Sequence, residues 1–155
     1  MAFLRGLSKD AELRYLSNAK CIILTLGVSI YMEDGDGYPA PGDIKTAKHI
    51  GPNTTGDLLI KIQNLIKKTN PDTKIILTVS SIPHAASPFE GKNAFTLDCI
   101  SKSFLRSGVE IALSRETEGL YYWPSFEVIR WFFGHSIWKF GDGGGHARHV
   151  DPRLI

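Results

Sequence analysis

The sequence predicts an α/β fold, a three-layer α/β/α arrangement around a parallel sheet of the flavodoxin-like kind. Continuous apolar runs, which are typical of strands buried on both faces, alternate along the chain with stretches of helical periodicity. Polar residues directly follow two of these runs, as they do where parallel strands end at a ligand site. This alternation favours parallel strands joined by helical connections.

Three strands, four helices and one long loop are predicted. The strands are the apolar run Cys21–Leu26, the β-branched run Lys74–Val79 and the short segment Leu120–Tyr122. The helices are expected at residues 8–17, from 54 to the Asn70–Pro71 stop, at 93–114 and from 125 to Gly134. Ser8 and Ser125 are expected to cap the first and last helix, and Asp57 stands in a capping-box position. The apolar stripes of the last two helices consist of Leu97, Ile100, Phe104 and Ile111 and of Val128, Ile129, Phe132 and Phe133. Residues 33–53 form an irregular loop, long enough to suggest a functional segment.

Composition indicates one globular domain spanning residues 1–155. Hydrophobic residues make up 43% of the chain and charged residues 22%, which is ordinary for a soluble protein. The net charge of +2 comes without a basic stripe, so no nucleic-acid partner is expected. No stretch suits a membrane span or a signal peptide, and Cys21 and Cys99, inside apolar runs, are expected to be buried free thiols. These features favour the cytoplasm.

Four short strings in the second half of the chain carry a family resemblance. They are T-V-S-S-I-P-H at 78–84, S-K-S-F-L-R at 101–106, Y-Y-W-P-S-F-E at 121–127 and G-H-A-R-H-V at 145–150. In this order they resemble the GSCFA domain, a member of the SGNH (GDSL-like) group of esterases and acyl hydrolases. The resemblance runs from about Ala19 to the end of the chain.

The resemblance also implies that part of the domain is missing at the N-terminal side. The family is named for a Gly-Ser-Cys-Phe-Ala string that carries the expected serine nucleophile, and the sequence contains no such string. Related SGNH folds have about five strands, two of them expected before residue 1. The chain then represents the C-terminal portion of a larger domain, or a divergent member without the serine. Truncation would leave Cys21–Leu26 with an open edge through which copies could associate.

The end of the chain is the expected source of the general base. In SGNH enzymes a late loop supplies a histidine base and an aspartate that orients it. By the family-like R-H-V string the base is His149, with Asp142 as its orienter. By spacing alone Asp142 pairs less tidily with His146, four residues on. Arg148 is expected to bind substrate or to pair with an acid such as Glu127, and solvated tail residues are the plainer alternative.

The strand ends are the expected walls of the site. The resemblance places Gly27 and Ser29 at the oxyanion position, where the Gly27 N–H is the preferred donor, although Gly27 could simply serve a tight turn. Ser80 and His84 follow the next strand and should line the same cleft as substrate-binding residues, His84 alternatively capping the turn at Pro83. Ser80 is not expected to be the nucleophile, because it lacks a strand-to-helix elbow.

Two basic residues of the S-K-S-F-L-R string lie one helical turn apart. Lys102 and Arg106 could bind an anionic substrate, although a solvated helix face is the commoner reason for such spacing. Glu127 is expected to be a first-turn acid favoured by the helix dipole. No metal or cofactor is expected, because the glycine run at 141–145 is no dinucleotide fingerprint and His146-x-x-His149 lacks the zinc-protease pattern.

Two functions remain open from the sequence. The resemblance implies a serine acyl hydrolase, esterase or acyltransferase acting on a small-molecule or carbohydrate ester. The alternative is a non-catalytic binding or assembly module that keeps the cleft and meets a partner chain through the open strand edge and the C-terminal aromatic residues.

Overall fold

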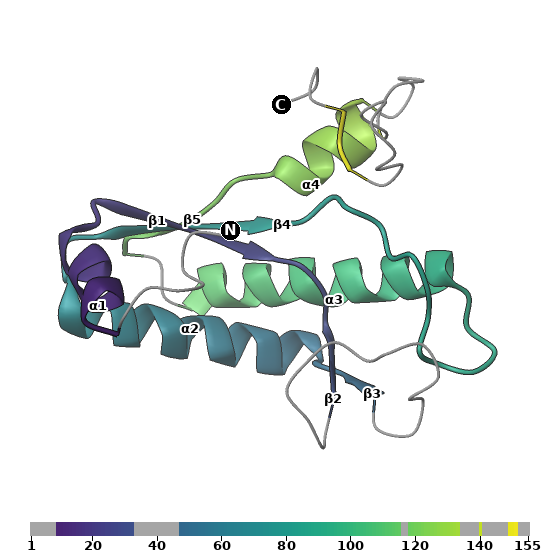
Figure 1. Ribbon diagram of the computed structural model, residues 1–155, viewed down its shortest axis with the longest axis horizontal. Helices are drawn as coiled ribbons and strands as arrows, with labels where there is room; N and C mark the ends of the chain where they lie inside the picture. The colour runs from purple at the N-terminus through teal and green to yellow at the C-terminus, as the bar shows by residue number, and fades with distance from the viewer. Residues whose placement is uncertain (1–8, 33–46, 116–117, 134–139, 141–148, 152–155) are drawn as a thin grey trace.

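The centre of the fold is a three-stranded parallel sheet. The computed structural model of the chain describes residues 9–32, 47–115, 118–133, 140 and 149–151 (Figure 1). Strands β1 (Cys21–Leu26), β4 (Lys74–Val79) and β5 (Leu120–Tyr122) form the sheet in the order β1–β4–β5. The α/β class with a parallel sheet is therefore confirmed, and all three predicted strands keep their predicted bounds.

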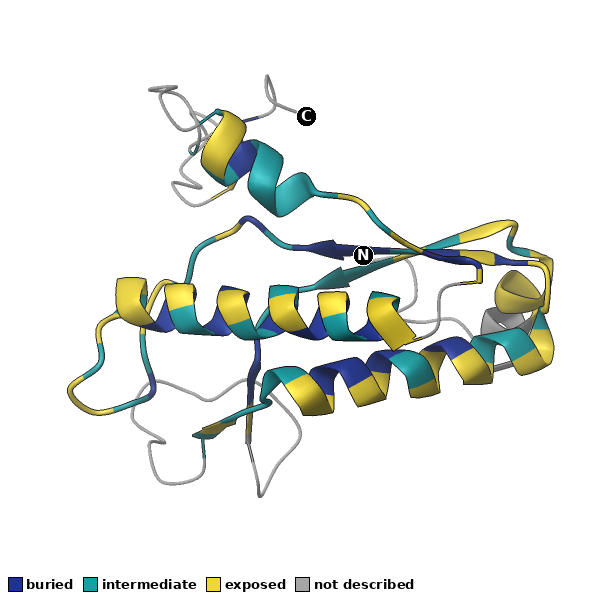
Figure 2. Ribbon diagram, turned by 180° about the vertical axis from the view of Figure 1, so that it is seen from behind, coloured by how far each residue is buried: buried dark blue, intermediate teal, exposed yellow. Residues whose placement is uncertain are grey.

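The middle strand β4 forms the centre of the core. Its register pairs Ile75 with Ile22 of β1 and with Leu120 of β5, so these side chains share one face of the sheet. Ile75, Leu77 and Val79 on that face are almost completely buried. Figure 2 shows β4 as a mostly buried strand, while the exposed residues of the helices lie on their outer sides. The β-branched run found in the sequence is thus the apolar core of the fold.

Two long helices cover that buried face side by side (Figure 1). They are α2 (Pro52–Thr69) and α3 (Ala94–Arg115). The helices approach closely where Gly56 and Gly108 face each other's helix. A Cβ atom built at Gly108 would lie 2.5 Å from the side chain of Thr55, and one at Gly56 would lie 2.7 Å from Ile111. Glycine at both positions is therefore required by the packing of α2 on α3.

The start of α2 differs from the prediction. The helix begins at Pro52, with Gly51 at its N-cap, and not at Thr54. Proline supplies the first helical position, where its missing N–H costs nothing. Asp57 consequently lies too deep in the helix to cap it, and its carboxylate pairs with Arg115 at the end of α3 instead.

A small hairpin occupies part of the segment predicted as an irregular loop. Strands β2 (Ile30–Met32) and β3 (Ala47–His49) pair antiparallel, with Ile30 opposite His49. The loop prediction for 33–53 was therefore wrong at both β3 and the start of α2, while residues 33–46 lie outside the described part. Helix α1 (Lys9–Asn18) precedes β1, and the Asn70 side chain fixes its end by donating to the carbonyls of Leu16 and Ala19.

The last helical segment lies over the opposite face of the sheet, at the carboxyl ends of the strands (Figure 1). It consists of a single turn, α4 (Ser125–Glu127), that continues as a π-helix, η1 (Val128–Phe132). Ser125 does not cap this segment, because Pro124 holds the N-cap position without a side-chain bond. Ile129 is buried as predicted, but Phe132 is exposed, because the wider π-helical turn rotates it away from the stripe expected for an α-helix.

The face of the sheet opposite α2 and α3 carries several exposed apolar side chains, including Ile23, Tyr121 and Trp123. Cys21 is exposed at the start of β1 and Cys99 is exposed on α3, so the prediction of buried thiols was wrong and the cysteines give no information on the compartment. None of the described helices combines the length and apolar character needed to cross a membrane.

Candidate functional site

A pocket of about 480 Å³ opens at the carboxyl ends of β1 and β4, and we call it the strand-end pocket. Its walls come from the ends of both strands, from α4–η1 and from the returning C-terminal segment. The lining residues are Thr25, Thr78, Ser80, Ser81, Ile82, Trp123, Ser125, Val128, Ile129, His149 and Val150. This is the edge at which parallel sheets bind their ligands.

Hydroxyl groups fix the rim of the strand-end pocket. The Ser125 hydroxyl donates to the carbonyl oxygen of Val79 at 3.2 Å and also contacts the Thr78 hydroxyl. Because Ser125 has one proton to donate, Thr78 is the donor in their shared bond. The Ser80 hydroxyl accepts the N–H of Ile82 at 3.3 Å, which leaves its own proton to donate. The rim therefore combines ordered hydroxyls with an apolar floor.

The pocket brings together two of the predicted site residues, Ser80 from the end of β4 and His149 from the end of the chain. An antiparallel bridge between Phe140 and Val150 holds the neighbour of His149 in place. Asp142, His146 and Arg148 lie outside the described residues. The roles predicted for these residues stay predictions, but Ser80 and His149 share a wall of one cavity.

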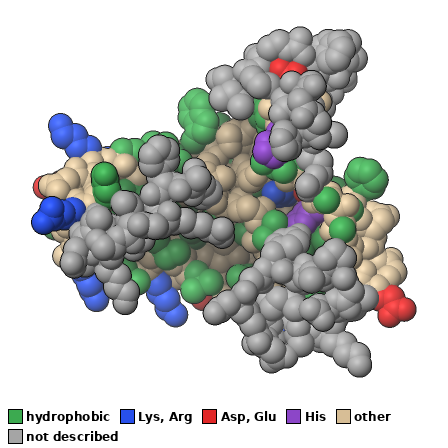
Figure 3. All heavy atoms as spheres, in the orientation of Figure 1, with side chains coloured by type: hydrophobic (Ala, Val, Ile, Leu, Met, Phe, Trp, Pro, Cys, Tyr) green, Lys and Arg blue, Asp and Glu red, His purple; other side chains and the backbone are tan. Residues whose placement is uncertain are grey.

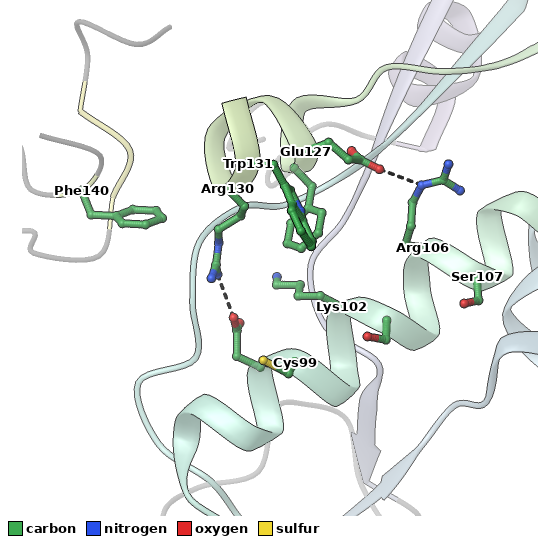
Figure 4. Close-up of a pocket in the computed structure, with 11 residues that line it drawn as sticks. Cys99, Lys102, Arg106, Ser107, Glu127, Arg130, Trp131 and Phe140 are labelled. Carbon is green, nitrogen blue, oxygen red and sulfur yellow. Dashed lines mark hydrogen bonds and ion pairs between the residues drawn. The ribbon is translucent and has the colours of Figure 1, made fainter. Parts of the chain in front are cut away.

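A buried polar cluster joins α3 to the same ends of the strands. The ammonium of Lys102 donates to the carbonyl oxygen of Gly27 at 2.7 Å. Asp98 accepts the N–H of His84 at 3.1 Å with one carboxylate oxygen and pairs with Arg130 at 2.7 Å with the other. Figure 4 shows Arg130 reaching from η1 down to α3. We call Asp98, Ser101 and Lys102 the α3 polar cluster.

The α3 polar cluster anchors segments that are distant in sequence. Lys102 reaches the end of β1, and Asp98 reaches the turn after β4, while Arg130 also donates through its Nε atom to the Ser81 carbonyl at 3.0 Å. Lys102 is therefore not on a solvated helix face. Its side chain is buried, and this burial is the main cause that lowers the pKa of Lys102 to about 8. The negative charge of Asp98 raises this pKa in part, and the positive charge of Arg130 lowers it further.

Ser29 lies in the hairpin contact with α3. Its backbone N–H donates to the Ser101 hydroxyl at 2.8 Å, and its own hydroxyl lies 2.9 Å from Nδ1 of His49. The His49 ring stacks on Phe89, with ring centres 4.9 Å apart. Burial, and then the positive charge of Lys92, lower the pKa of His49. Although Ser29 and His49 have the geometry of a nucleophile and base, Ser29 is completely buried, so the pair holds the hairpin in place.

Gly27 is exposed where β1 ends, with its carbonyl oxygen held by Lys102. Its backbone has no positive φ, and a Cβ atom there would meet no described atom within 4 Å. Neither turn conformation nor packing among the described residues therefore requires glycine at this position. Gly27, Ser29 and His84 are not among the described residues that line the strand-end pocket.

Glu127 lies in the first turn of α4, as predicted, and it has further partners among the described residues. Its carboxylate accepts Nε of Arg106 at 2.7 Å and the phenol of Tyr122 at 2.6 Å, and Arg106 also pairs with Glu110 (Figure 4). Burial alone would raise the pKa of Glu127, but the hydrogen bonds from Tyr122 and Arg106 outweigh it and lower that pKa. Burial and the bond to Glu127 raise the pKa of Tyr122. The Y-Y-W-P-S-F-E string thus ties β5 and α4 to α3.

Asp98 and Arg130 were not predicted as site residues, and the buried role of Ser101 was not predicted either. A signal was present in the spacing of α3: positions 98, 101, 102 and 105 recur at one helical turn, with Leu105 on the same side. The interpretation followed the apolar residues alone and so selected a neighbouring stripe. Asp98, Ser101 and Lys102 lie on the same face of the helix as the buried Leu105, and this placement indicated a buried polar network.

The space-filling view shows a hollow in which histidine and basic side chains lie together (Figure 3). Among the described residues, no group of three or more His, Cys, Asp or Glu side chains is placed to hold a metal ion.

Comparison with known proteins gives one match. The model of the GSCFA family matches residues 6–139, most of the chain. This range includes Gly27, Ser80 and the α3 polar cluster, and it ends before His149. No curated protein and no solved structure matches the chain.

Proposed function

Because this chain belongs to the GSCFA family, we propose that it forms the acid–base half of a serine-type esterase or acyltransferase of the SGNH kind. The observation that carries the proposal is the strand-end pocket, where His149 lies with Ser80 at the carboxyl ends of parallel strands. A histidine in such a pocket, beside ordered hydroxyls, has the surroundings that a general base needs.

The chemistry is acyl transfer through a covalent intermediate. The nucleophilic serine is not one of the 155 residues, since the sequence lacks the Gly-Ser-Cys-Phe-Ala string. As the serine oxygen attacks the ester carbonyl carbon, His149 accepts the serine proton. The carbon–oxygen bond to the alcohol then breaks, and His149 returns the proton to the leaving alcohol. Water or a second hydroxyl next gives its proton to His149 and attacks the acyl carbon. The bond from that carbon to the serine oxygen then breaks, and His149 returns the proton to the serine.

The remaining residues would support these steps. Asp142 orients the His149 ring, and the Gly27 N–H stabilises the negative oxygen that forms on the carbonyl. The bond from Lys102 to the Gly27 carbonyl holds the next peptide along the chain, and so steadies the backbone beside the proposed donor. Ser29 would not donate to the oxyanion, because its hydroxyl already bonds with His49. It would support the site by holding the hairpin against α3.

The lining of the strand-end pocket suits a hydroxylated ester. Trp123 is 62% exposed at the pocket, and Thr25, Ser80 and Ser125 supply hydroxyl groups nearby. An exposed indole next to hydroxyls provides a stacking surface together with donors and acceptors, which is how proteins bind sugars. An acylated carbohydrate is therefore the proposed substrate class.

Fluorophosphonate labelling tests the assignment of the nucleophile. The 155-residue chain is expected to remain unlabelled, because none of its serines is expected to be an activated nucleophile. Labelling that disappears in Ser80→Ala would place the nucleophile in this chain and overturn that part of the proposal. Ser107→Ala, at an exposed serine of α3, is the matched control.

Ester turnover by the natural gene product tests the base. His149→Ala is expected to lower kcat by several orders of magnitude, as loss of a triad histidine does. His146→Ala is the control and should cost little. Equal losses at both positions, or a larger loss at His146, would remove His149 from the proposed role.

A binding or assembly module is the second candidate, and one observation favours it. The sheet exposes Ile23 on β1 and Tyr121 on β5, and no described strand pairs with the outer edge of β1. Such an edge can accept another strand. Light scattering of the purified chain tests this candidate. A monomer would argue against it, whereas an assembly that Ile23→Lys disrupts would support it.

A further inference from the structure

A second cavity lies between α3 and α4–η1, and we call it the interhelix pocket (Figure 4). Its volume is about 650 Å³, which is in the range of sites for small organic ligands. It is separated from the strand-end pocket by α4–η1, whose residues Ser125, Val128 and Ile129 line the other cavity. The lining residues are Asp98, Cys99, Lys102, Ser103, Arg106, Ser107, Phe126, Glu127, Arg130, Trp131 and Phe140.

Lys102 is the least satisfied charged group in this wall. Its side chain is only 2% exposed, and its ammonium has one hydrogen-bond acceptor among the described residues, the Gly27 carbonyl. An ammonium has three N–H donors. Figure 4 shows the Lys102 side chain pointing into the space between the two helical segments. A buried cation with unused donors at a cavity wall is costly unless an anion or water completes its shell.

The other charges of the interhelix pocket largely neutralise one another. Arg130 pairs with Asp98 at 2.7 Å, and Arg106 pairs with Glu127 at 2.7 Å. Both arginines of the lining therefore have a carboxylate partner, and Arg106 is also shared with Glu110 outside the lining, whereas the described bond of Lys102 is to a carbonyl oxygen. A ligand with a single negative charge would balance the wall, whereas a cation would be repelled.

Aromatic side chains form the remaining surface. Arg130 stacks over the rings of Phe126 and Phe140, at 5.7 Å and 5.4 Å, which keeps both rings beside the cavity. Trp131 lies at the mouth and is 74% exposed. This surface would bind an apolar group attached to the anion, because burying apolar area provides most of the affinity in such pockets.

We propose that the interhelix pocket binds a small organic monoanion, a carboxylate with an apolar body, and that Lys102 receives the carboxylate. The site differs from the one proposed for ester chemistry, so the two proposals can fail independently. The aromatic wall contacts the apolar body, while the Arg106–Glu127 and Arg130–Asp98 pairs link α3 to α4–η1 on either side of the ligand.

Calorimetric titration with octanoate, octanol and octylammonium tests the charge preference. Octanoate is expected to bind at least about tenfold more tightly than octanol, which has the same chain and no charge. Octylammonium should show no binding. Equal affinity for octanoate and octanol, or binding of octylammonium, would overturn the proposal by showing that the cavity recognises apolar chains alone.

Two variants locate the site. Lys102→Met keeps most of the length of the side chain and removes the charge, and it should weaken octanoate at least about tenfold while leaving octanol within about threefold. Unchanged octanoate affinity in this variant would overturn the role of Lys102. Lys61→Met, at an exposed lysine of α2, is its control.

The second variant does not depend on a buried residue. Trp131→Ala removes an exposed ring that lines the cavity, so it should weaken octanoate severalfold without affecting the fold. Phe132→Ala, at the neighbouring exposed position that is not part of the described lining, should bind octanoate as the wild type does. If both variants bind alike, the ligand lies elsewhere and the proposal fails.

Discussion

The two halves of helix α3 differ in whether they bury polar side chains. The C-terminal half turns Leu105, Gly108, Val109 and Ala112 toward the core, where they pack on β4 and α2. The N-terminal half buries Leu97 as well, but it also turns the α3 polar cluster inward, where it binds the ends of β1 and β4 and the π-helix. One half therefore contributes apolar area that stabilises any α/β sandwich, and the other fixes the positions of particular loops.

The difference shows how one helix can serve two purposes. Apolar contacts are non-directional, so they set the distance between helix and sheet but tolerate small shifts. The bonds of Asp98 and Lys102 are directional, and each reaches a backbone group at the edge where the pockets open. The polar half thus costs desolvation energy and in return determines the geometry of the candidate sites.

Breaking the polar half should have the largest effect. Asp98→Ala leaves the Arg130 guanidinium and the His84 N–H without their carboxylate, and removal of one partner from a buried pair typically costs about 3 kcal/mol. Urea unfolding measures this loss. Asp57→Ala removes the exposed partner of Arg115 and should cost less than about 1 kcal/mol. Similar losses in the two variants would contradict the contrast.

Overpacking the apolar half should have the next effect. Gly108→Ala places a methyl group 2.5 Å from Thr55, and such overpacking costs about 1–3 kcal/mol, more than alanine gains from its helical propensity. A net loss of about 1–2 kcal/mol is expected in the same unfolding assay. Gly27→Ala, at an exposed position without a positive φ where a Cβ meets no described atom within 4 Å, should not lower stability. A neutral Gly108→Ala would mean that α2 can move away from α3.

The protonation of Lys102 should appear in the pH dependence of stability. Its pKa is about 8 in the folded chain and about 10.4 in an unfolded one, so between these values the unfolded chain binds an extra proton. The free energy of unfolding of the wild type, relative to Lys102→Met, should therefore rise with pH in this window, by at most about 1.4 kcal/mol per pH unit. Lys61→Met should give a flat difference, and a flat difference for Lys102→Met would show that its ammonium stays charged.

The smallest expected effect concerns the hairpin. Burial lowers the pKa of His49, so the folded chain resists the proton that an unfolded histidine accepts below about pH 6.5. Stability from this residue is complete above that pH and is lost as the pH falls. Compared with His49→Gln, the wild type should lose a fraction of a kcal/mol between about pH 6.5 and pH 5. Parallel stability curves would contradict a buried neutral imidazole.

Much of the fold could be predicted from the sequence, because continuous β-branched runs have few alternatives. The bounds of β1 and β4 follow from such runs. The hairpin was missed because β3 is only Ala47–His49, a segment without apolar periodicity whose pairing depends on contacts distant in sequence. The exposure of Phe132 could not be predicted, since a π-helical turn leaves no pattern in one sequence.

The candidate site was predictable to a smaller extent. Resemblance to the family drew attention to Ser80 and His149, and both line the strand-end pocket. Spacing alone could not show that Lys102 is buried against Gly27, because helical periodicity indicates a face but not which neighbour covers it. Asp98 was not selected, since an acid within an apolar helix suggests solvent until its partner Arg130, far along the chain, is known.

The helical segment α4–η1 forms a wall between the two pockets. Glu127, Arg130 and Trp131 line the interhelix pocket, while Val128 and Ile129 line the strand-end pocket. A movement of α4–η1 that enlarges one pocket therefore narrows the other. A ligand that binds one pocket and favours one position of this segment changes the affinity of the other pocket for its own ligand. By thermodynamic linkage, the second ligand changes the affinity for the first by the same factor.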